Sequence, residues 1–539
     1  MLEKLRLEIT KIKYMRAKSA RNTTLASTNF MYLITEDMVY LKILSSILKR
    51  NIAKYPNGHH LVFPQYGIRF YNDPKLSKFP RILKLLANFV NDSLLEYKRN
   101  KESLNRLRLY INNEEIYMQI AVVPIWAWII QLIKSNVRYF IKQPVSEDFS
   151  NELSFIEKFK FGEIPVGDLI ADSYIRYKGE ARFELKSRFT NELSAITHAL
   201  IGLYQAYSKG LNRKGYFFGQ YSTYVHHGIP LRFAFYNEWK CATFASSTSF
   251  FKVHEHTSLA LRYGPRHTED HTLYSGKQAA NLPIQIIEKS REILKARTFG
   301  VYDNTMDYMN NNIQSDTGIR LLSKDRINGM RIIMLHDFFD SVHVYNWLLF
   351  PDFWSWCTNT IDFCIANNLP ILIKPHPNQI EGSEKFCKNL RAIYANQSLV
   401  QWLNPQIKNN EIFKKNPSLL ISVYGSVVAE SAFCNIPVLL AGDHPAYNFK
   451  LGFTANTLEQ YYEYLLKPQR SMNSDLKEKS VLFTALHNQK MISSKGDSLK
   501  AHFNLRRLNQ ADLNRKLLSK ELSNYLNENI IQLSDQMGL

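Results

Sequence analysis

The chain has 539 residues, of which 45% are hydrophobic and 22% are charged. This composition excludes a disordered protein, and the length is greater than a single hydrophobic core ordinarily holds. We therefore expect two domains with additional helices. Lysine and arginine (68) outnumber aspartate and glutamate (48), and the net charge of +20 favours an anionic partner: a nucleotide-linked substrate, an acidic polymer, nucleic acid or an anionic membrane surface.

Two segments bear on membrane association. Residues 1–22 carry seven lysines or arginines against two acids, with aliphatic residues between them. This pattern predicts a partly amphipathic helix that either stays solvated or rests on a membrane surface. The apolar segment Ile120–Ile133 contains Pro124 and has about 14 residues, whereas a membrane span needs roughly 20. We expect it to be buried or interfacial.

The cysteines and the N-terminus indicate the compartment. The five cysteines have no zinc-like spacing, and an odd number suits reduced thiols better than a disulfide framework. The N-terminus lacks an uninterrupted apolar run ahead of a small-residue cleavage site. We expect a cytoplasmic protein, either free or peripheral on the cytoplasmic face of the inner membrane.

The order of helical and strand patterns predicts the fold class. Before residue 151 the pattern is mainly helical, with isolated strand candidates at Phe30–Ile34 and His60–Phe63. After it, short apolar runs alternate with helical patterns, which is typical of a parallel sheet wrapped in helices. This predicts an α/β protein with two Rossmann-type, doubly wound domains facing a cleft. The expected segments are a helical N-terminal region (1–150), an acceptor-side domain (151–329), a nucleotide-donor domain (330–465) and C-terminal helices that pack back (466–539).

Two polar turns of the second domain suit a phosphate. Each follows an apolar run, Ile371–Ile373 and Leu419–Ile421, and ligands bind at the carboxyl ends of such strands. The first turn presents an imidazole between two prolines, and the second opens a helix whose N–H groups favour an anion. A plain helix cap with a solvated glutamate is the alternative for the second turn. The donor-binding candidates are Lys374, His376, Pro377, Gly425, Ser426 and Glu430.

These turns carry a family resemblance. The runs IKPHPN and SVYGSVVAESAFCNIPVLLAGDHPAY resemble the C-terminal half of bacterial capsule and surface-polysaccharide glycosyltransferases of GT-B architecture. They are similar to the capsule transferases that use CMP-linked 3-deoxy-octulosonate, and more distantly to bacterial sialyltransferases and CDP-glycerol polymerases. The resemblance extends over about residues 160–450. It implies that His376 and Ser426 hold the donor phosphate and that Glu430 contacts the ribose.

The chemistry of sugar transfer needs a base or a carboxylate nucleophile. Asp168 and Asp172 are spaced i, i+4, and Arg176 continues their face if the segment is helical. We expect Asp168 to be the base or nucleophile, with Asp172 and Arg176 orienting it, although a purely structural Asp168 is the alternative. His226 is an acceptor-side candidate. Four residues are expected to line the cleft, without binding a metal: His336, Asp337, Asp340 and His343.

The resulting hypothesis is a glycosyltransferase that moves a sugar, with an acidic sugar on a CMP-linked donor favoured, onto a capsule or lipopolysaccharide-type glycan. A nucleotide-sugar donor and a glycan or glycolipid acceptor are the expected partners, and no metal or other cofactor is required. A CDP-polyol phosphotransferase of the teichoic-acid type and a sugar-nucleotide epimerase are enzymatic alternatives. A basic nucleic-acid-binding protein is the alternative from another class, although no clustered arginine and aromatic module is visible.

Overall fold

The structure is a computed structural model of the chain. It describes residues 28–64, 98–141, 148–208, 215–244, 251–266, 271, 274–299, 327–377, 379, 382–405, 407–468, 475–493 and 510–539. The predicted basic helix at residues 1–22 lies outside the described residues.

The first domain is built on a six-stranded sheet whose strand order is β3-β2-β1-β6-β7-β8. Five strands are parallel, and only the edge strand β8 runs antiparallel to β7. The central strand β1 is buried along its whole length, as expected for a parallel strand covered on both faces. The strands are β1 (Asn29–Ile34), β2 (His59–Pro64), β3 (Ile120–Val122), β6 (Gly215–Gln220), β7 (Lys240–Phe244) and β8 (Lys252–His254).

This sheet begins well before the expected start of the first domain. Three of its six strands come from the region that the sequence pattern assigned to a separate helical segment, 1–150. β1 pairs with β6 across nearly two hundred residues of chain. Such pairing leaves no local signal, because parallel neighbours are joined by long crossover connections. The two strand candidates near the N-terminus were therefore recognised, but not as part of the Rossmann-type sheet.

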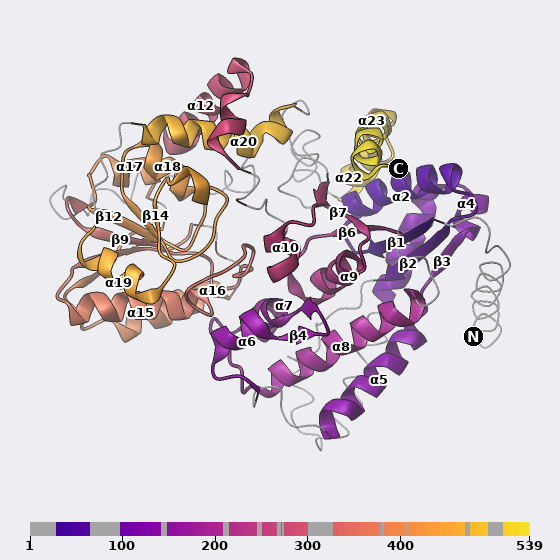
Figure 1. Ribbon diagram of the computed structural model, residues 1–539, viewed down its shortest axis with the longest axis horizontal. Helices are drawn as coiled ribbons and strands as arrows, with labels where there is room; N and C mark the ends of the chain where they lie inside the picture. Colours follow the sequence, from indigo (N-terminus) through magenta and orange to yellow (C-terminus); the bar gives the residue numbers. More distant parts are fainter. Residues whose placement is uncertain are drawn as a thin grey trace.

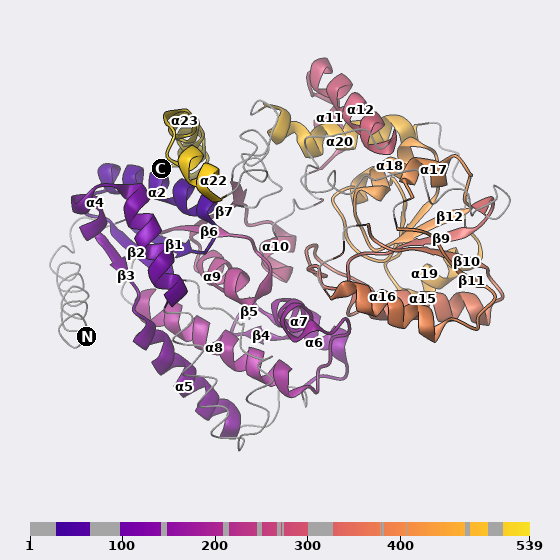
Figure 2. The ribbon, with the colours of Figure 1, turned by 180° about the vertical axis from the view of Figure 1, so that it is seen from behind.

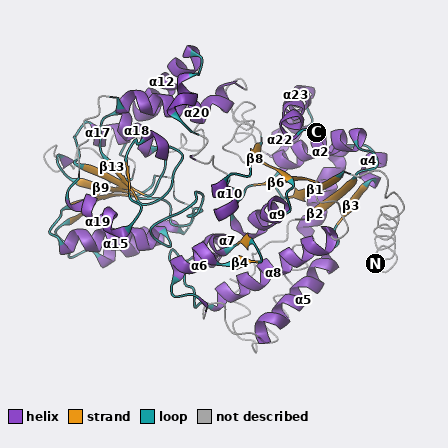
Figure 3. Cartoon of the chain, in the orientation of Figure 1, coloured by secondary structure: helices purple, strands orange, loops and turns teal. Residues whose placement is uncertain are grey.

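Helices cover both faces of the first sheet (Figures 1 and 3). α5 and α8 pack along each other, α7 and α9 both pack against α8, and α9 also contacts the sheet through β6 and β7 (Figure 1). The helices and short elements of this half are α2 (Met38–Lys54), α4 (Glu114–Met118), α5 (Ile125–Ile141), α6 (Glu152–Lys158), β4 (Lys160–Phe161), β5 (Ile164–Pro165), α7 (Gly167–Tyr174), the π-helix Ile175–Gly179, α8 (Arg188–Ser208), α9 (Tyr224–Tyr236) and α10 (Ser258–Tyr263). The next helix, α11 (Gly276–Ala280), packs on α20 (Leu476–Ser493) and belongs with the second domain.

The second domain is built on a six-stranded, entirely parallel sheet with the order β11-β10-β9-β12-β13-β14. Its strands are β9 (Arg331–Met334), β10 (Ile371–Lys374), β11 (Val400–Trp402), β12 (Leu419–Ser422), β13 (Val438–Leu440) and β14 (Phe453–Thr454). Its helices are α12 (Ile284–Phe299), α15 (Phe353–Ala366), α16 (Ser383–Ile393), α17 (Asn409–Phe413), α18 (Val427–Phe433), the 3₁₀ helix Tyr447–Phe449 and α19 (Leu458–Leu466). Together the two sheets confirm the predicted α/β class with two Rossmann-type, GT-B-like domains.

The C-terminal helices contact both domains. α20 (Leu476–Ser493) packs on α12 and α18 of the second domain. α22 (Gln510–Leu517) and α23 (Lys520–Met537) return to the first domain, where α23 lies against α2 and β8. Figure 2 shows the same arrangement from behind, with the two groups of helices over different domains. The last described helices thus lie on the domain that contains β1.

The apolar segment near residue 120 does not form one element. It divides at Pro124 into β3 and α5, and α5 buries Trp128 and Leu132 while leaving Ile130 and Ile133 exposed. Among the described residues, no helix has both the length and the hydropathy that crossing a bilayer requires.

Candidate functional site

Three adjacent strands of the second sheet direct their following loops to one edge. β9 lies between β10 and β12, and all three are parallel. Their carboxyl ends therefore meet at the same edge of the sheet, where ligands of doubly wound domains bind. His336 follows β9 by two residues, His376 follows β10 by two residues, and Gly425 lies in the turn between β12 and α18.

His336 is the centre of this group. Its Nε2 lies 3.1 Å from Ser422 Oγ and accepts the Val423 N–H at 3.4 Å. Its ring stacks on Phe353 at 4.5 Å and contacts the ring of Tyr424 at 4.8 Å. Burial, with a further contribution from nearby His376, lowers the pKa of His336 to about 3. The imidazole is therefore neutral at physiological pH and acts as a hydrogen-bonding group.

Both predicted turns lie next to His336. His376 is close enough for its charge to affect the pKa of His336. On the other turn, a Cβ placed on Gly425 would lie 3.9 Å from His336 Cε1. Gly425 has a φ of +117°, which only glycine adopts readily, so the backbone itself forms this wall. Ser426 precedes α18, but its side chain makes no helix-capping hydrogen bond.

Behind these turns lies a buried lysine and glutamate. Lys374 Nζ donates to the carbonyl oxygen of Pro405 at 3.3 Å, and Glu430 Oε2 accepts a hydrogen bond from Asn409 Nδ2 at 2.8 Å. Burial lowers the pKa of Lys374 to about 8, and the carboxylate of Glu430 opposes this shift. Glu430 is only 5% exposed. A ribose could reach this carboxylate only after some rearrangement of its surroundings.

Asp168 occupies a different setting from the one expected. Arg232 binds both of its oxygens, at 2.7 and 2.6 Å, and Arg266 Nη1 forms a further ion pair with Oδ2. Burial alone would raise the pKa of Asp168, but the two guanidinium groups outweigh it and hold the pKa well below its usual range. A general base needs a pKa near the working pH. The two ion pairs therefore favour the structural alternative for Asp168 over the predicted role as base or nucleophile.

Asp172 and His343 form a dyad across the two domains. α7 confirms the helical spacing of the two aspartates, and Asp172 Oδ1 lies 2.7 Å from His343 Nδ1. The same oxygen accepts the backbone N–H groups of Val342 and His343 at 3.1 and 3.3 Å. A carboxylate accepts hydrogen bonds, so Nδ1 of His343 is the donor in this pair, and in a neutral ring the lone pair is then on Nε2. His343 Nε2 is buried and has no hydrogen-bond partner within the described residues.

The remaining predicted residues surround this dyad less closely. Arg176 lies in the π-helix after α7, is exposed, and donates a long hydrogen bond of 3.5 Å to the Phe339 carbonyl oxygen. Asp337 accepts the Phe339 N–H at 2.8 Å and so stabilises its own turn. Asp340 keeps solvent-accessible surface, yet the surrounding protein raises its pKa, and Asp337 adds repulsion. Asp337 and Asp340 therefore belong to the same loop as His336.

His226 lies in a strained segment that follows β6. Tyr221 and Tyr224 have positive φ angles of 56° and 61°, which is unusual for bulky residues. His226 is buried, stacks near Tyr224, and lies 3.3 Å from the Tyr177 hydroxyl through Nε2. The adjacent His227 is also buried, and its Nδ1 has no hydrogen-bond partner in the described part of the chain. Backbone strain of this kind concentrates at functional sites.

Tyr224 connects this segment to the second domain. Burial raises the pKa of Tyr224, whereas a hydrogen bond with Ser341 and the charge of Arg176 act in the opposite direction. Sequence reasoning missed Tyr224 and also the two arginines that bind Asp168. Arg232 stood within an otherwise apolar run, LRFAF. A charged residue within an apolar run indicates a buried ion pair, and this signal could have predicted the burial of Arg232.

Within the described residues, no group of three histidine, cysteine, aspartate or glutamate side chains could hold a metal ion. The predicted site residues thus fall into two groups. His336, His376, Gly425 and Ser426 gather at the edge of the second sheet, with Lys374 and Glu430 behind them. Asp168, Asp172 and His343 lie where the two domains touch.

Comparisons with known proteins give structural neighbours only. No protein-family model matches the chain, and no curated protein sequence matches it. Among solved structures, it is similar to a UDP-GlcNAc 2-epimerase from Neisseria meningitidis bound to UDP-GlcNAc (TM-score 0.28, 9% identity, 87% of this chain and 98% of that one). It is also similar to Anabaena HepE in complex with UDP and glucose (0.24, 10%, 89% and 99%) and to a glycosyltransferase from Rickettsia africae (0.25, 9%, 92% and 100%). At these TM-scores the similarity carries no information on the substrate.

Proposed function

We propose that the chain is a glycosyltransferase that takes a sugar from a nucleotide-linked donor, with an acidic sugar on a CMP-linked donor favoured, and adds it to a capsule or lipopolysaccharide-type glycan. One observation carries this proposal: His336, His376 and the Gly425 turn come from three adjacent strands and gather at one edge of a parallel sheet. That edge is where nucleotides bind in doubly wound domains.

On the donor side, the leaving phosphate lies between the two turns. His376 and the neutral His336 donate hydrogen bonds to its oxygens, and the N–H groups after Gly425 add further donors. Lys374, whose pKa is about 8, supplies a positive charge from beneath at neutral pH. These groups stabilise the negative charge that develops on the phosphate as the bond from the sugar to the phosphate breaks.

On the acceptor side, His343 replaces Asp168 as the candidate base. Asp172 holds the Nδ1 proton, which leaves the Nε2 lone pair for the proton of an acceptor hydroxyl. As that proton moves to Nε2, the acceptor oxygen bonds to the anomeric carbon, and the electron pair of the breaking C–O bond leaves with the nucleotide. Because Nε2 is buried here, the acceptor reaches it only after a local opening of the domain contact.

The donor part of the proposal is tested by nucleotide binding. CMP or CDP should raise the melting temperature, because a ligand that binds only the folded state stabilises it by mass action. His376→Ala should weaken that response, whereas Lys388→Gln, which removes an exposed cation of α16, should not. An unchanged response in His376→Ala would contradict the phosphate site.

Product analysis tests the reaction. Incubation with CMP-linked sugars and with CDP-glycerol should give sugar transfer from the former only; transfer of phosphoglycerol would establish the polyol phosphotransferase instead. His343→Gln should lower kcat while leaving the CMP-induced stabilisation intact. Steeply salt-dependent binding of oligonucleotides without any response to nucleotides would favour the nucleic-acid-binding alternative.

A further inference from the structure

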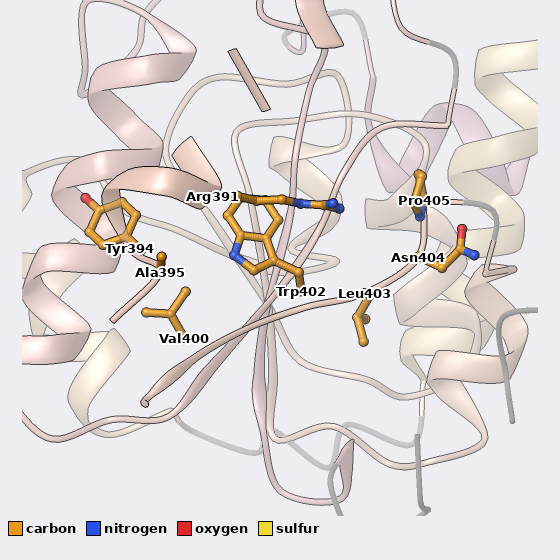
Figure 4. Close-up of a pocket in the computed structure, with 8 residues that line it drawn as sticks. All are labelled: Arg391, Tyr394, Ala395, Val400, Trp402, Leu403, Asn404 and Pro405. Carbon is orange, nitrogen blue, oxygen red and sulfur yellow. The ribbon is translucent and has the colours of Figure 1, made fainter. Parts of the chain in front are cut away.

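A pocket of about 470 Å³ lies at the outer edge of the second sheet, between the end of α16 and the edge strand β11 (Figure 4). We call it the edge pocket. None of the predicted site residues lines it. It is lined by Arg391, Tyr394, Ala395, Val400, Trp402, Leu403, Asn404 and Pro405.

The edge pocket combines an aromatic face with an available cation. Trp402 is partly exposed, and the Arg391 guanidinium carbon lies 5.0 Å from its ring centroid. Arg391 is exposed, and the contact of its guanidinium group that the structure shows is with the Trp402 ring. In Figure 4 its guanidinium group extends past Trp402 toward Asn404 and Pro405. The Tyr394 hydroxyl donates instead to Asp362, which is not part of the lining.

These features suit an acidic sugar. An aromatic face packs against the C–H face of a sugar ring, and a planar guanidinium group matches a carboxylate through two parallel hydrogen bonds. The exposed side chain of Asn404 can donate to and accept from hydroxyl groups. The volume falls within the range of about 300–1,000 Å³ that small-ligand pockets occupy.

The edge pocket is also connected to the candidate donor site. The carbonyl oxygen of Pro405, in its lining, accepts the hydrogen bond from Lys374 Nζ at 3.3 Å. Lys374 is the last residue of β10, and His376 follows it by two residues. A glycan held in the edge pocket would therefore bind to the same domain as the proposed donor phosphate. The end of β10, at Lys374, would lie between the two.

We propose that the edge pocket binds an acidic sugar residue of the acceptor glycan, with the ring on Trp402 and the carboxylate on Arg391. This inference rests on the proposed function, which supplies the glycan. It adds a second contact for the acceptor outside the reacting site, so a long acceptor is held at two points. Such a contact raises the affinity for polymeric acceptors over single sugars.

The test measures binding of defined oligosaccharides by titration calorimetry. The probes are a glucuronate-containing and a sialate-containing tetrasaccharide, each with its carboxyl-reduced counterpart. Wild type should bind at least one acidic probe about tenfold more tightly than its reduced form, as expected for loss of one charged hydrogen-bonding pair. Arg391→Gln should bind both forms of that probe equally weakly, and Trp402→Ala should bind neither. Lys388→Gln, the matched control on the same helix, should behave as wild type.

Several results would overturn the inference. They are equal binding of acidic and reduced probes by wild type, no binding of either acidic probe, or an Arg391→Gln variant that still discriminates. Loss of the CMP response in a folded Trp402→Ala variant would show that the edge pocket takes a nucleobase instead. The melting temperature of each variant shows whether it is folded. Trp402→Phe keeps an aromatic ring and should retain part of the affinity for the acidic probe.

The inference and the proposed function fail separately. If CMP and CDP give no stabilisation but Arg391→Gln loses acidic discrimination, the edge pocket stands as a glycan site on a protein with another activity. If His376→Ala loses the CMP response while wild type binds no oligosaccharide, the transferase proposal survives and the edge pocket inference is wrong.

Discussion

Replacement of Asp168 by asparagine separates a structural role from a catalytic one. Asp168 is 4% exposed. Its carboxylate forms ion pairs with both Arg232 and Arg266. Arg232 is completely buried. The Asp168→Asn side chain nearly preserves shape but removes the negative charge, which leaves two guanidinium groups uncompensated in a poorly solvated interior.

The expected cost follows from that geometry. Breaking a buried ion pair by removing one partner costs about 3–5 kcal/mol of unfolding free energy. For a domain of this size, a loss of about 1 kcal/mol of unfolding free energy lowers the melting temperature by roughly 2–4 °C. The melting temperature of Asp168→Asn should therefore be lower by roughly 6–20 °C. In wild type the pKa of Asp168 is depressed in the folded state. Its contribution is therefore fully present above the unfolded pKa of about 3.9 and is lost as the pH falls below that value.

Calorimetric melting at several pH values is the appropriate assay. Glu163→Gln, which removes an exposed carboxylate from the same segment, should change the unfolding free energy by less than about 0.5 kcal/mol. The difference between wild type and Asp168→Asn should shrink below about pH 4. A variant that melts like wild type but has lost all transfer activity would refute this reasoning and restore Asp168 as a catalytic residue.

Three further predictions concern the second domain. Lys374 is buried, and between pH 8 and 10.5 it loses its proton in the folded state while the same lysine in the unfolded chain keeps it. The unfolding free energy of wild type, measured relative to Lys374→Met by denaturant titration, should therefore rise with pH by up to about 3 kcal/mol. Parallel pH profiles of the two proteins would contradict the depressed pKa. Gly425→Ala should cost about 1–3 kcal/mol, because its φ of +117° strains any other residue although the Cβ itself has space; unchanged denaturation would show that the turn relaxes. Tyr424→Phe removes the hydroxyl that lies 3.0 Å from the carbonyl oxygens of Ser341 and Val342; it should lower kcat and keep the CMP response, and an unaltered kcat would exclude a role in holding the His343 loop.

Local sequence patterns were sufficient for the four-residue strands of the second sheet, β9, β10 and β12. The runs at Arg331–Leu335, Ile371–Ile373 and Leu419–Ile421 are aliphatic, short and bounded by polar turns, which is the pattern of a buried parallel strand. The two-residue strand β14 and the three-residue strand β11 gave no such signal, because they are too short to show a period. The first sheet was harder, since β1 lies between partners that are distant in sequence.

The site was predictable to the extent that it depends on local spacing. The i, i+4 spacing of Asp168 and Asp172 indicated a shared helical face, and α7 has that face. The roles of these residues depend on partners that are 64 and 98 residues away for Asp168 and 171 residues away for Asp172. No local pattern specifies such contacts. The sequence therefore could not show that Asp168 pairs with two arginines and that Asp172 pairs with a histidine of the other domain.

The contacts between the domains also link the two halves of the candidate site. Asp172 of the first domain holds the loop at Val342 and His343, and the Tyr424 hydroxyl holds the same loop from the second domain. The ring of Tyr424 in turn contacts His336, next to the Gly425 turn. A ligand that moves the Gly425 turn must therefore act on the loop that carries His343. Because packed contacts of this kind switch between discrete arrangements rather than stretch, donor binding and exposure of His343 Nε2 are expected to occur together.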